Sequence, residues 1–309
     1  MFSYILKRLL QVIPVFFGAT LLIYFMVFAM PGDPIIALFG DKTPPPQVLE
    51  QLRERYHLDQ PFIVQYFIFL GNIFRGDLGV SFSGQPVSEV LASTFPVTLR
   101  LAALAVFFEM VAGITVGLIS GLRKGGIFDA SALVVSLILI SVPIFVVAFV
   151  AQYIFGIQLG WFRTTVGTGA PTQDLILPAL VLATISFAQI SRLTRASVIE
   201  TESQDFVRTA ASKGLARTRI VPVHILRNSL IPVVTYLAVD FGTLMVGATV
   251  TEGIFNVPGV GRTLYQAIIR GEGPTVVAFV TFMVLIYLVV NLLVDLLYAV
   301  LDPRIRYAK

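Results

Sequence analysis

Six stretches of mostly apolar residues dominate this chain, and each has about the length of a helix that crosses a lipid bilayer, about 20 residues. Charged residues make up only 13% of the 309 residues, about half of their share in soluble proteins. The predicted fold class is therefore an all-α integral membrane protein with six transmembrane helices. The expected spans are roughly 9–30, 97–121, 129–155, 174–196, 230–251 and 276–300.

The basic residues predict how these spans are oriented. Lys and Arg are enriched in cytoplasmic loops. With the N-terminus inside, 14 of the 22 Lys and Arg residues are cytoplasmic, and seven of them lie between Arg192 and Arg227. An even number of spans then places both termini in the cytoplasm. The opposite orientation would put the basic 192–227 region outside.

The spans divide the chain into three expected parts. Residues 1–30 form the first transmembrane helix, and residues 31–95 form an extracytoplasmic loop subdomain. Residues 96–309 form a five-helix core with a cytoplasmic loop at about 197–229. Inside the outer loop, the apolar run 61–74 is too short to span and predicts a helix that packs or lies at the interface.

Composition also excludes several classes of function. The chain has no cysteine and only two histidines, which are far apart in sequence. This excludes disulfides and Cys-ligated metals and argues against a metal or haem site. The net charge of +4 fits basic cytoplasmic loops, so no nucleic-acid partner is expected. No G-x-x-x-x-G-K-[ST] phosphate loop is present, so any ATP hydrolysis has to occur on another chain.

The cytoplasmic segment 205–215 is the most informative part of the sequence. Phe206, Thr209, Ala210 and Lys213 have the spacing of one helical face. Gly214 suits the left-handed position that ends a helix. The pattern predicts a short helix lying across the membrane face, which could transmit a push from a cytoplasmic partner. The alternative is an ordinary basic loop helix packed on lipid headgroups.

The same segment resembles the EAA loop of ABC importer permeases. Arg208 stands where that motif often has Glu, but the fuller string is similar to the peptide-permease version, R-T-A-x-x-K-G-L followed by H-x-x-R-N-x-x-x-P. The segments Arg208–Leu215 and His224–Pro232 match that version. The resemblance therefore points to a peptide permease.

Further matches to this family follow in order along about 250 residues. They include P-G-D-P at 31–34, Y-H-L-D-Q-P at 56–61, G-D-L-G-V-S at 76–81 and P-G-V-G-R at 258–262, with Glu252 and Phe255 before the last. One departure is Arg270-Gly271-Glu272-Gly273-Pro274, where the family often has R-D-Y-P. The chain is similar to the first permease subunit of a dipeptide/oligopeptide ABC importer. Nickel and glutathione permeases belong to the same family.

The resemblance implies a type I ABC importer permease fold in the bacterial inner membrane. This chain would be half of the channel, paired with a homologous second permease and served by an extracytoplasmic substrate-binding protein. It would bind no cofactor, because ATP and Mg belong to two partner ATPases. Those ATPases would dock on Asp205, Phe206, Arg208, Thr209, Ala210, Ala211, Lys213, Gly214 and Leu215.

Acidic residues within the spans are costly and indicate function by default. Glu109 and Asp240 lie near the middle of the second and fifth spans. They are candidates for the translocation path, and the alternative is a carboxyl group that faces the bundle and bonds to another helix. The candidates for an outer gate or a dock for the binding protein are Glu252, Phe255, Pro258, Gly259 and Arg262, with loop capping as the alternative.

Two features of the spans concern packing. Gly113, Gly117 and Gly121 give the second span a face of small residues, which suits either packing within the chain or a subunit interface. Pro143 is expected to kink the third span.

Two other classes of function compete with the importer. A self-contained secondary transporter driven by protons through Asp240 and Glu109 is compatible with six spans. An intramembrane enzyme would need a nucleophile and base or a metal constellation, and the absence of cysteine disfavours it.

Overall fold

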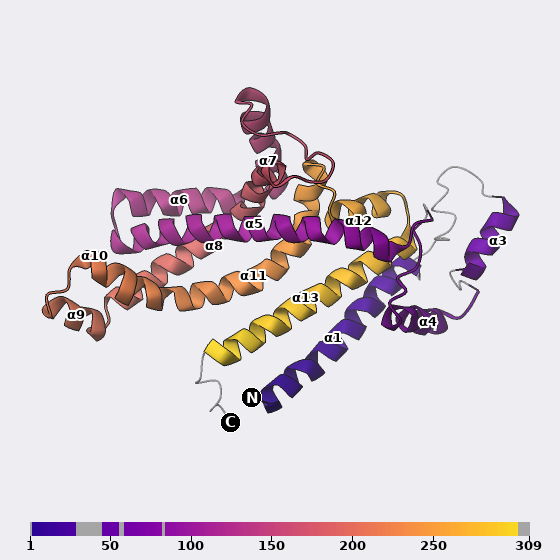
Figure 1. The fold of residues 1–309 in the computed structure, drawn as a ribbon, viewed down its shortest axis with the longest axis horizontal. Helices are drawn as coiled ribbons and strands as arrows, with labels where there is room; N and C mark the ends of the chain where they lie inside the picture. Colours follow the sequence, from indigo (N-terminus) through magenta and orange to yellow (C-terminus); the bar gives the residue numbers. More distant parts are fainter. Residues whose placement is uncertain (1, 29–44, 56–58, 82–83, 302–309) are drawn as a thin grey trace. The chain divides into compact units, whose positions relative to one another are not determined.

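The computed structural model describes residues 2–28, 45–55, 59–81 and 84–301, and the matches at 31–34 and 56–58 lie outside these residues. The described elements are helices, with one isolated antiparallel bridge between Val80 and Pro86. The chain forms two compact units (Figure 1). Unit 1 contains Met1–Thr98 and Pro258–Lys309, and unit 2 contains Leu99–Val257.

Unit 1 joins the two ends of the chain. The long helices α1 and α13 lie side by side in it (Figure 1). Its elements are α1 (Phe2–Phe28), α3 (Pro46–Arg55), α4 (Phe62–Phe74), the start of α5 (Val87–Leu122), α12 (Val260–Ile269) and α13 (Gly273–Leu301).

Helix α4 is the short apolar helix that the run 61–74 predicts. It buries Tyr66 and Leu70 in a core with Phe16 of α1 and Leu288 of α13. The Tyr66 hydroxyl lies 2.9 Å from Oγ1 of Thr20 and donates to the carbonyl of Phe17. Because these hydrogen bonds satisfy the polar groups of the contact, α4 packs on α1 through apolar surface without leaving a buried hydroxyl unpaired.

A second core of unit 1 holds the start of α5 against α12 and α13. Val87 and Leu91 pack with Phe279. Helix α5 begins about ten residues before the predicted span, because the segment before Pro96 continues the same helix. At the start of α12, the backbone N–H of Val260 donates to Oγ1 of Thr98 at 2.9 Å, which caps this helix.

Unit 2 contains the rest of α5 and a bundle around the long helices α8 and α11, which pack on each other. Its other elements are α6 (Ile127–Ser141), α7 (Ile144–Ala151), the π-helical turn η1 (Gln152–Gln158), α8 (Thr172–Glu202), α9 (Asp205–Ser212), α10 (Arg217–Ile220), the π-helical turn η2 (Val221–Leu226) and α11 (Arg227–Ile254).

The number of spans agrees with the prediction. Five helices are long and apolar enough to cross a membrane, and a sixth span is formed if the bent pair α6 and α7–η1 counts as one. The bend is 104° and falls at Pro143, where a kink is predicted. Figure 1 shows α7 turning away from the line of α6. Proline causes this break because it lacks the N–H that continues the helix.

The small residues of α5 pack against α8 of the same chain. A Cβ atom on Gly117 would lie 2.5 Å from the carbonyl oxygen of Ser191, and one on Gly113 would lie 2.7 Å from the side chain of Ile190. A Cβ on Gly121 would meet Val198 at 2.7 Å. The structure thus assigns this face to packing within the chain, because the two backbones approach too closely for any side chain.

Candidate functional site

The candidate coupling site is built around α9, which begins at Asp205 and ends at Ser212. Gly214 follows with φ of +77°, the left-handed conformation that its position predicts. The N–H of Gly214 donates to the carbonyl of Ala211, and the N–H of Leu215 donates to that of Ala210. These two bonds form a Schellman motif, which ends the helix and turns the chain back.

One side of α9 packs on the rest of unit 2. Val207 and Ala210 are buried in a cluster with Val198 of α8, Ile220 of α10 and Ile225 of η2. Leu215 packs against the same cluster, which gives the motif its hydrophobic contact. Ala210 thus faces its own chain, while Phe206, Thr209 and Lys213 of the predicted face are exposed.

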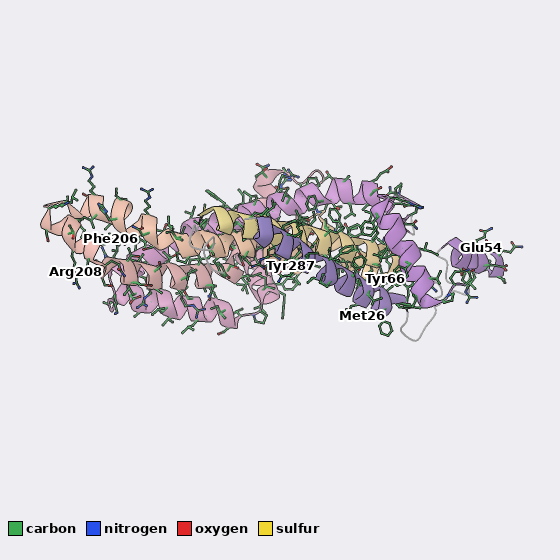
Figure 2. All side chains as sticks on the ribbon, turned by 90° about the horizontal axis from the view of Figure 1, so that it is seen from below. Met26, Glu54, Tyr66, Phe206, Arg208 and Tyr287 are labelled. Atoms are coloured by element: carbon green, nitrogen blue, oxygen red, sulfur yellow. The ribbon has the colours of Figure 1, made fainter. Side chains whose placement is uncertain are left out.

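The other side of α9 is open to a partner. It presents a charge pair, Asp205 and Arg208, whose side chains are both exposed. Phe206 is 44% exposed, an unusual position for a large apolar side chain outside the spans. Figure 2 shows Phe206 and Arg208 where the chain turns between α8 and α11. Of the predicted docking residues, the exposed ones are Asp205, Phe206, Arg208, Thr209, Ala211, Lys213 and Gly214.

The elements on which α9 packs are bonded to one another. The hydroxyl of Ser229 in α11 lies 3.1 Å from Oγ1 of Thr201 in α8, and Ser229 is fully buried. On the surface, Arg217 of α10 donates to Glu202 at the end of α8 at 2.9 Å. These two bonds hold the end of α8 to α10 and to the start of α11, beside the cluster on which α9 packs.

A largely buried ion pair joins α6 to α8 near the coupling site. Arg195 of α8 donates twice to Asp129 of α6, from Nε to Oδ1 at 2.5 Å and from Nη2 to Oδ2 at 2.8 Å. The Asp129 side chain is 3% exposed, and its Oδ2 also accepts from the N–H of Gly125. This bidentate pair locks the start of α6 to α8.

The two mid-membrane acids lie together inside unit 2. Glu109 of α5 is 1% exposed and Asp240 of α11 is 6% exposed. Their carboxyl groups interact electrostatically, and the hydroxyl of Tyr236 interacts with Asp240 and with Ser186 of α8. These polar groups come from three helices of one chain. Both carboxyl groups are thus enclosed by helices of this chain.

The residues considered for an outer gate are distributed over both units. Glu252 and Phe255 belong to unit 2 and are fully buried, so neither side chain is accessible to another protein. Pro258, Gly259 and Arg262 belong to unit 1, where Gly259 caps the start of α12 and is buried. Of the five residues, Pro258 and Arg262 are partly exposed.

The structure offers no group of three or more His, Cys, Asp or Glu side chains that could hold a metal ion, within the residues that it describes. The chemistry of the coupling site is that of an interface: an exposed aromatic ring, exposed charges of both signs and a rigid support.

Sequence reasoning missed three residues that support the site. The spacing of Phe206, Thr209, Ala210 and Lys213 marks a neighbouring face of α9 and so does not indicate that Val207 is buried. Asp129 and Arg195 are 66 residues apart, and each has an ordinary explanation alone. The sequence carried one signal for this pair. Asp129 lies in the first turn of a predicted span beside a glycine turn, and Arg195 lies at the end of another predicted span on the same membrane face.

Comparison with protein families identifies the class. Residues 113–307 match the family described as the inner membrane component of binding-protein-dependent transport systems. Residues 1–102 match the N-terminal family of the membrane components of the same systems. The chain therefore belongs to this family, a family of multi-pass, non-catalytic transport subunits of the inner membrane.

Individual relatives share the whole length of the chain. It is 37% identical over 336 residues to the di/tripeptide transport system permease protein DppB of Pseudomonas aeruginosa, with all of both chains covered. It is 38% identical over 341 residues to the dipeptide transport system permease protein DppB of Escherichia coli K12, again with full coverage.

Proposed function

We propose that this chain is the permease subunit of an ATP-driven ABC importer for dipeptides and oligopeptides. The observation that carries the proposal is α9, a short helix with an exposed aromatic and charged face, fastened to two spans and ended by Gly214. Full-length likeness to permeases of dipeptide and di/tripeptide systems supports the cargo class.

The proposal gives the chain a defined set of partners. Membership of a binding-protein-dependent system implies an ATPase and a substrate-binding protein outside the membrane. We infer that two ATPase subunits act, one on α9 of this chain and one on the matching helix of a homologous second permease. The two permeases together enclose the path, so this chain alone is half of the channel.

Coupling follows from how α9 is held. Closure of the ATPases on ATP moves the surface under Phe206 and Arg208, and α9 follows as a rigid body. Because Val207 packs against Val198 and Ser229 bonds to Thr201, the displacement reaches α8 and α11. A packed interface of this kind transmits small shifts with little deformation.

In this proposal, Glu109 and Asp240 lie inside the helix bundle that moves. Both carboxyl groups are buried by helices of their own chain and interact with each other. We infer that they belong to the interior of this bundle and do not line the translocation path. Proton coupling through them, the basis of the secondary-transporter alternative, is not needed when ATP supplies the energy.

Reconstitution tests the proposal against the secondary transporter. In proteoliposomes that contain this chain, the second permease, the ATPases and the binding protein, we expect radiolabelled dipeptide uptake that requires ATP and withstands a protonophore. The chain alone is expected to hydrolyse no ATP. Uptake by the chain alone, driven by a proton gradient, would contradict the proposal.

A further inference from the structure

An apolar groove in unit 2 has no role in the proposed coupling. It has a volume of about 380 Å³ and lies between α7, η1, the following loop and the first half of α8. Val147 and Ala151 form one wall and Leu177 and Leu180 the other. The rings of Phe155 and Trp161 stand at its rim with centroids 5.9 Å apart, and Trp161 is 68% exposed.

The walls of the groove offer no hydrogen bond to an occupant. Two lining residues carry polar side-chain groups: the hydroxyl of Thr184 donates to the carbonyl of Val181 at 2.6 Å, and the indole N–H belongs to Trp161 at the rim. The backbone of α7 and α8 is bonded within the helices. A ligand for this groove therefore has to be hydrocarbon where it touches the walls.

The position of the groove along α8 corresponds to one leaflet of a bilayer. Leu177 and Thr184 are 5 and 12 residues after the start of α8 at Thr172. At about 1.5 Å per residue, they lie roughly 8 and 18 Å below the outer end of the helix. One leaflet contributes about 15 Å of hydrocarbon. Trp161 at the rim then stands at the interface, where tryptophan is enriched in membrane proteins.

A cation lies just above the groove on the headgroup side. Nη1 of Arg163 is 3.3 Å from Oδ2 of Asp174, and Asp174 precedes Leu177 by three residues on the same face of α8. The Asp174 side chain is 3% exposed whereas that of Arg163 is 68% exposed. The buried carboxylate thus anchors one edge of the guanidinium and leaves the rest open to a phosphate group.

We propose that this groove binds a phospholipid of the outer leaflet, with one acyl chain between α7 and α8 and the phosphate diester on Arg163. The charge beside the groove favours a phospholipid over a protein helix. Arg163 lies at the headgroup end of a slot with apolar walls, and a phospholipid supplies both a phosphate for the guanidinium and an acyl chain for the walls.

The single tryptophan of the chain supplies the probe. The emission of Trp161 is isolated as the difference between the wild-type chain and Trp161→Phe, which also removes the tryptophans of the partner subunits from the signal. We expect phosphatidylcholine with acyl-chain bromines near the headgroup to quench this emission by about half or more. The measurement is made in nanodiscs with the chain alone and with the chain in the assembled importer.

A matched pair of variants tests occupancy of the groove. Val147→Phe fills it, whereas Val150→Phe adds the same ring to a half-exposed position of α7 that does not line it. Native mass spectrometry should show about one phospholipid fewer per chain in Val147→Phe, together with weaker quenching, and no change in Val150→Phe. Thr184→Phe repeats the test from the opposite wall if Val147→Phe does not fold.

The headgroup contact has its own test. Arg163→Lys keeps the ion pair with Asp174 but loses bidentate binding of phosphate, so we expect faster loss of the retained lipid. Nanodiscs of phosphatidylglycerol and of phosphatidylethanolamine distinguish an anionic lipid from any phosphate diester. Protection of Trp161 from quenching in the assembled importer would overturn the proposal, as would an unchanged lipid count in Val147→Phe. A Val147→Phe variant that fails only to assemble with the second permease would identify a protein interface instead.

Discussion

Replacing Gly214 by valine is expected to reduce ATP-driven uptake at least fivefold while leaving the ATPases able to hydrolyse ATP. Gly214 has φ of +77°, and no atom lies within 4 Å of the place where a Cβ would stand. The effect therefore comes from the backbone alone. A left-handed conformation costs a residue with a side chain about 1–2 kcal/mol, and a difference of this size changes an equilibrium roughly 5–30-fold.

Asparagine at the same position separates backbone geometry from contact with the ATPase. Asn tolerates the left-handed region, so Gly214→Asn should keep uptake within about twofold of the wild type. Both variants enlarge the residue on the same exposed surface. Uptake and ATPase rates are measured on the same reconstituted complexes. Equal losses in the two variants would mean that the turn after α9 is not what Gly214 supplies.

Removing the carboxylate of Asp129 is expected to have the largest effect on stability. Asp129→Ala leaves Arg195 without its partner in a mostly buried place, and breaking a buried pair costs about 3–5 kcal/mol. This corresponds to a drop of roughly 10 °C in the melting temperature of the chain. Thermal unfolding of the purified chain in detergent measures it.

Two further variants show whether the charge pair is responsible. In Asp129→Leu with Arg195→Met, both charges are gone and apolar groups fill the space, so most of the lost stability should return. Glu202→Ala breaks the exposed pair with Arg217 at the same end of α8 and should cost less than about 1 kcal/mol. A double variant as unstable as Asp129→Ala would show that packing, and not the unpaired charge, decides the loss.

Local sequence signals predicted the individual helices well. The apolar stretches have a length that only a membrane span explains. The structure places long helices over five of them and the bent pair α6 and α7–η1 over the third. The left-handed glycine after α9 was predictable because glycine is the residue that a helix C-terminus most often uses in this conformation. The break at Pro143 follows from the missing N–H in the same way.

The contacts between helices were not predictable from spacing. The side chain of Ala210 is buried because α10 and η2 fold back under α9. The spacing of residues within the segment 205–215 does not predict this contact. The ion pair of Asp129 and Arg195 depends on the packing of α6 against α8. The glycine face of α5 was visible, but only the structure identifies α8 of the same chain as its partner.

The polar residues of the fourth span show why composition alone understates a buried helix. Ser186 and Ser191 make this span the least hydrophobic of the expected six. About two-thirds of the residues in its most apolar segment are nevertheless buried within the chain. A helix surrounded by other helices does not need a wholly apolar surface, because its polar groups meet protein and not lipid. The same reason allows Glu109 and Asp240 to lie within the spans.

Site-directed cross-linking tests the central claim, that α9 is the surface on which an ATPase docks. The chain has no cysteine, so Ser212→Cys, exposed at the end of α9, introduces a single thiol. Labelled with a maleimide photo-cross-linker, this variant should form a covalent adduct with an ATPase subunit in the assembled importer. Thr168→Cys, exposed in the loop before α8, should form none. An intact complex in which Ser212→Cys gives no adduct with the ATPase would contradict the account.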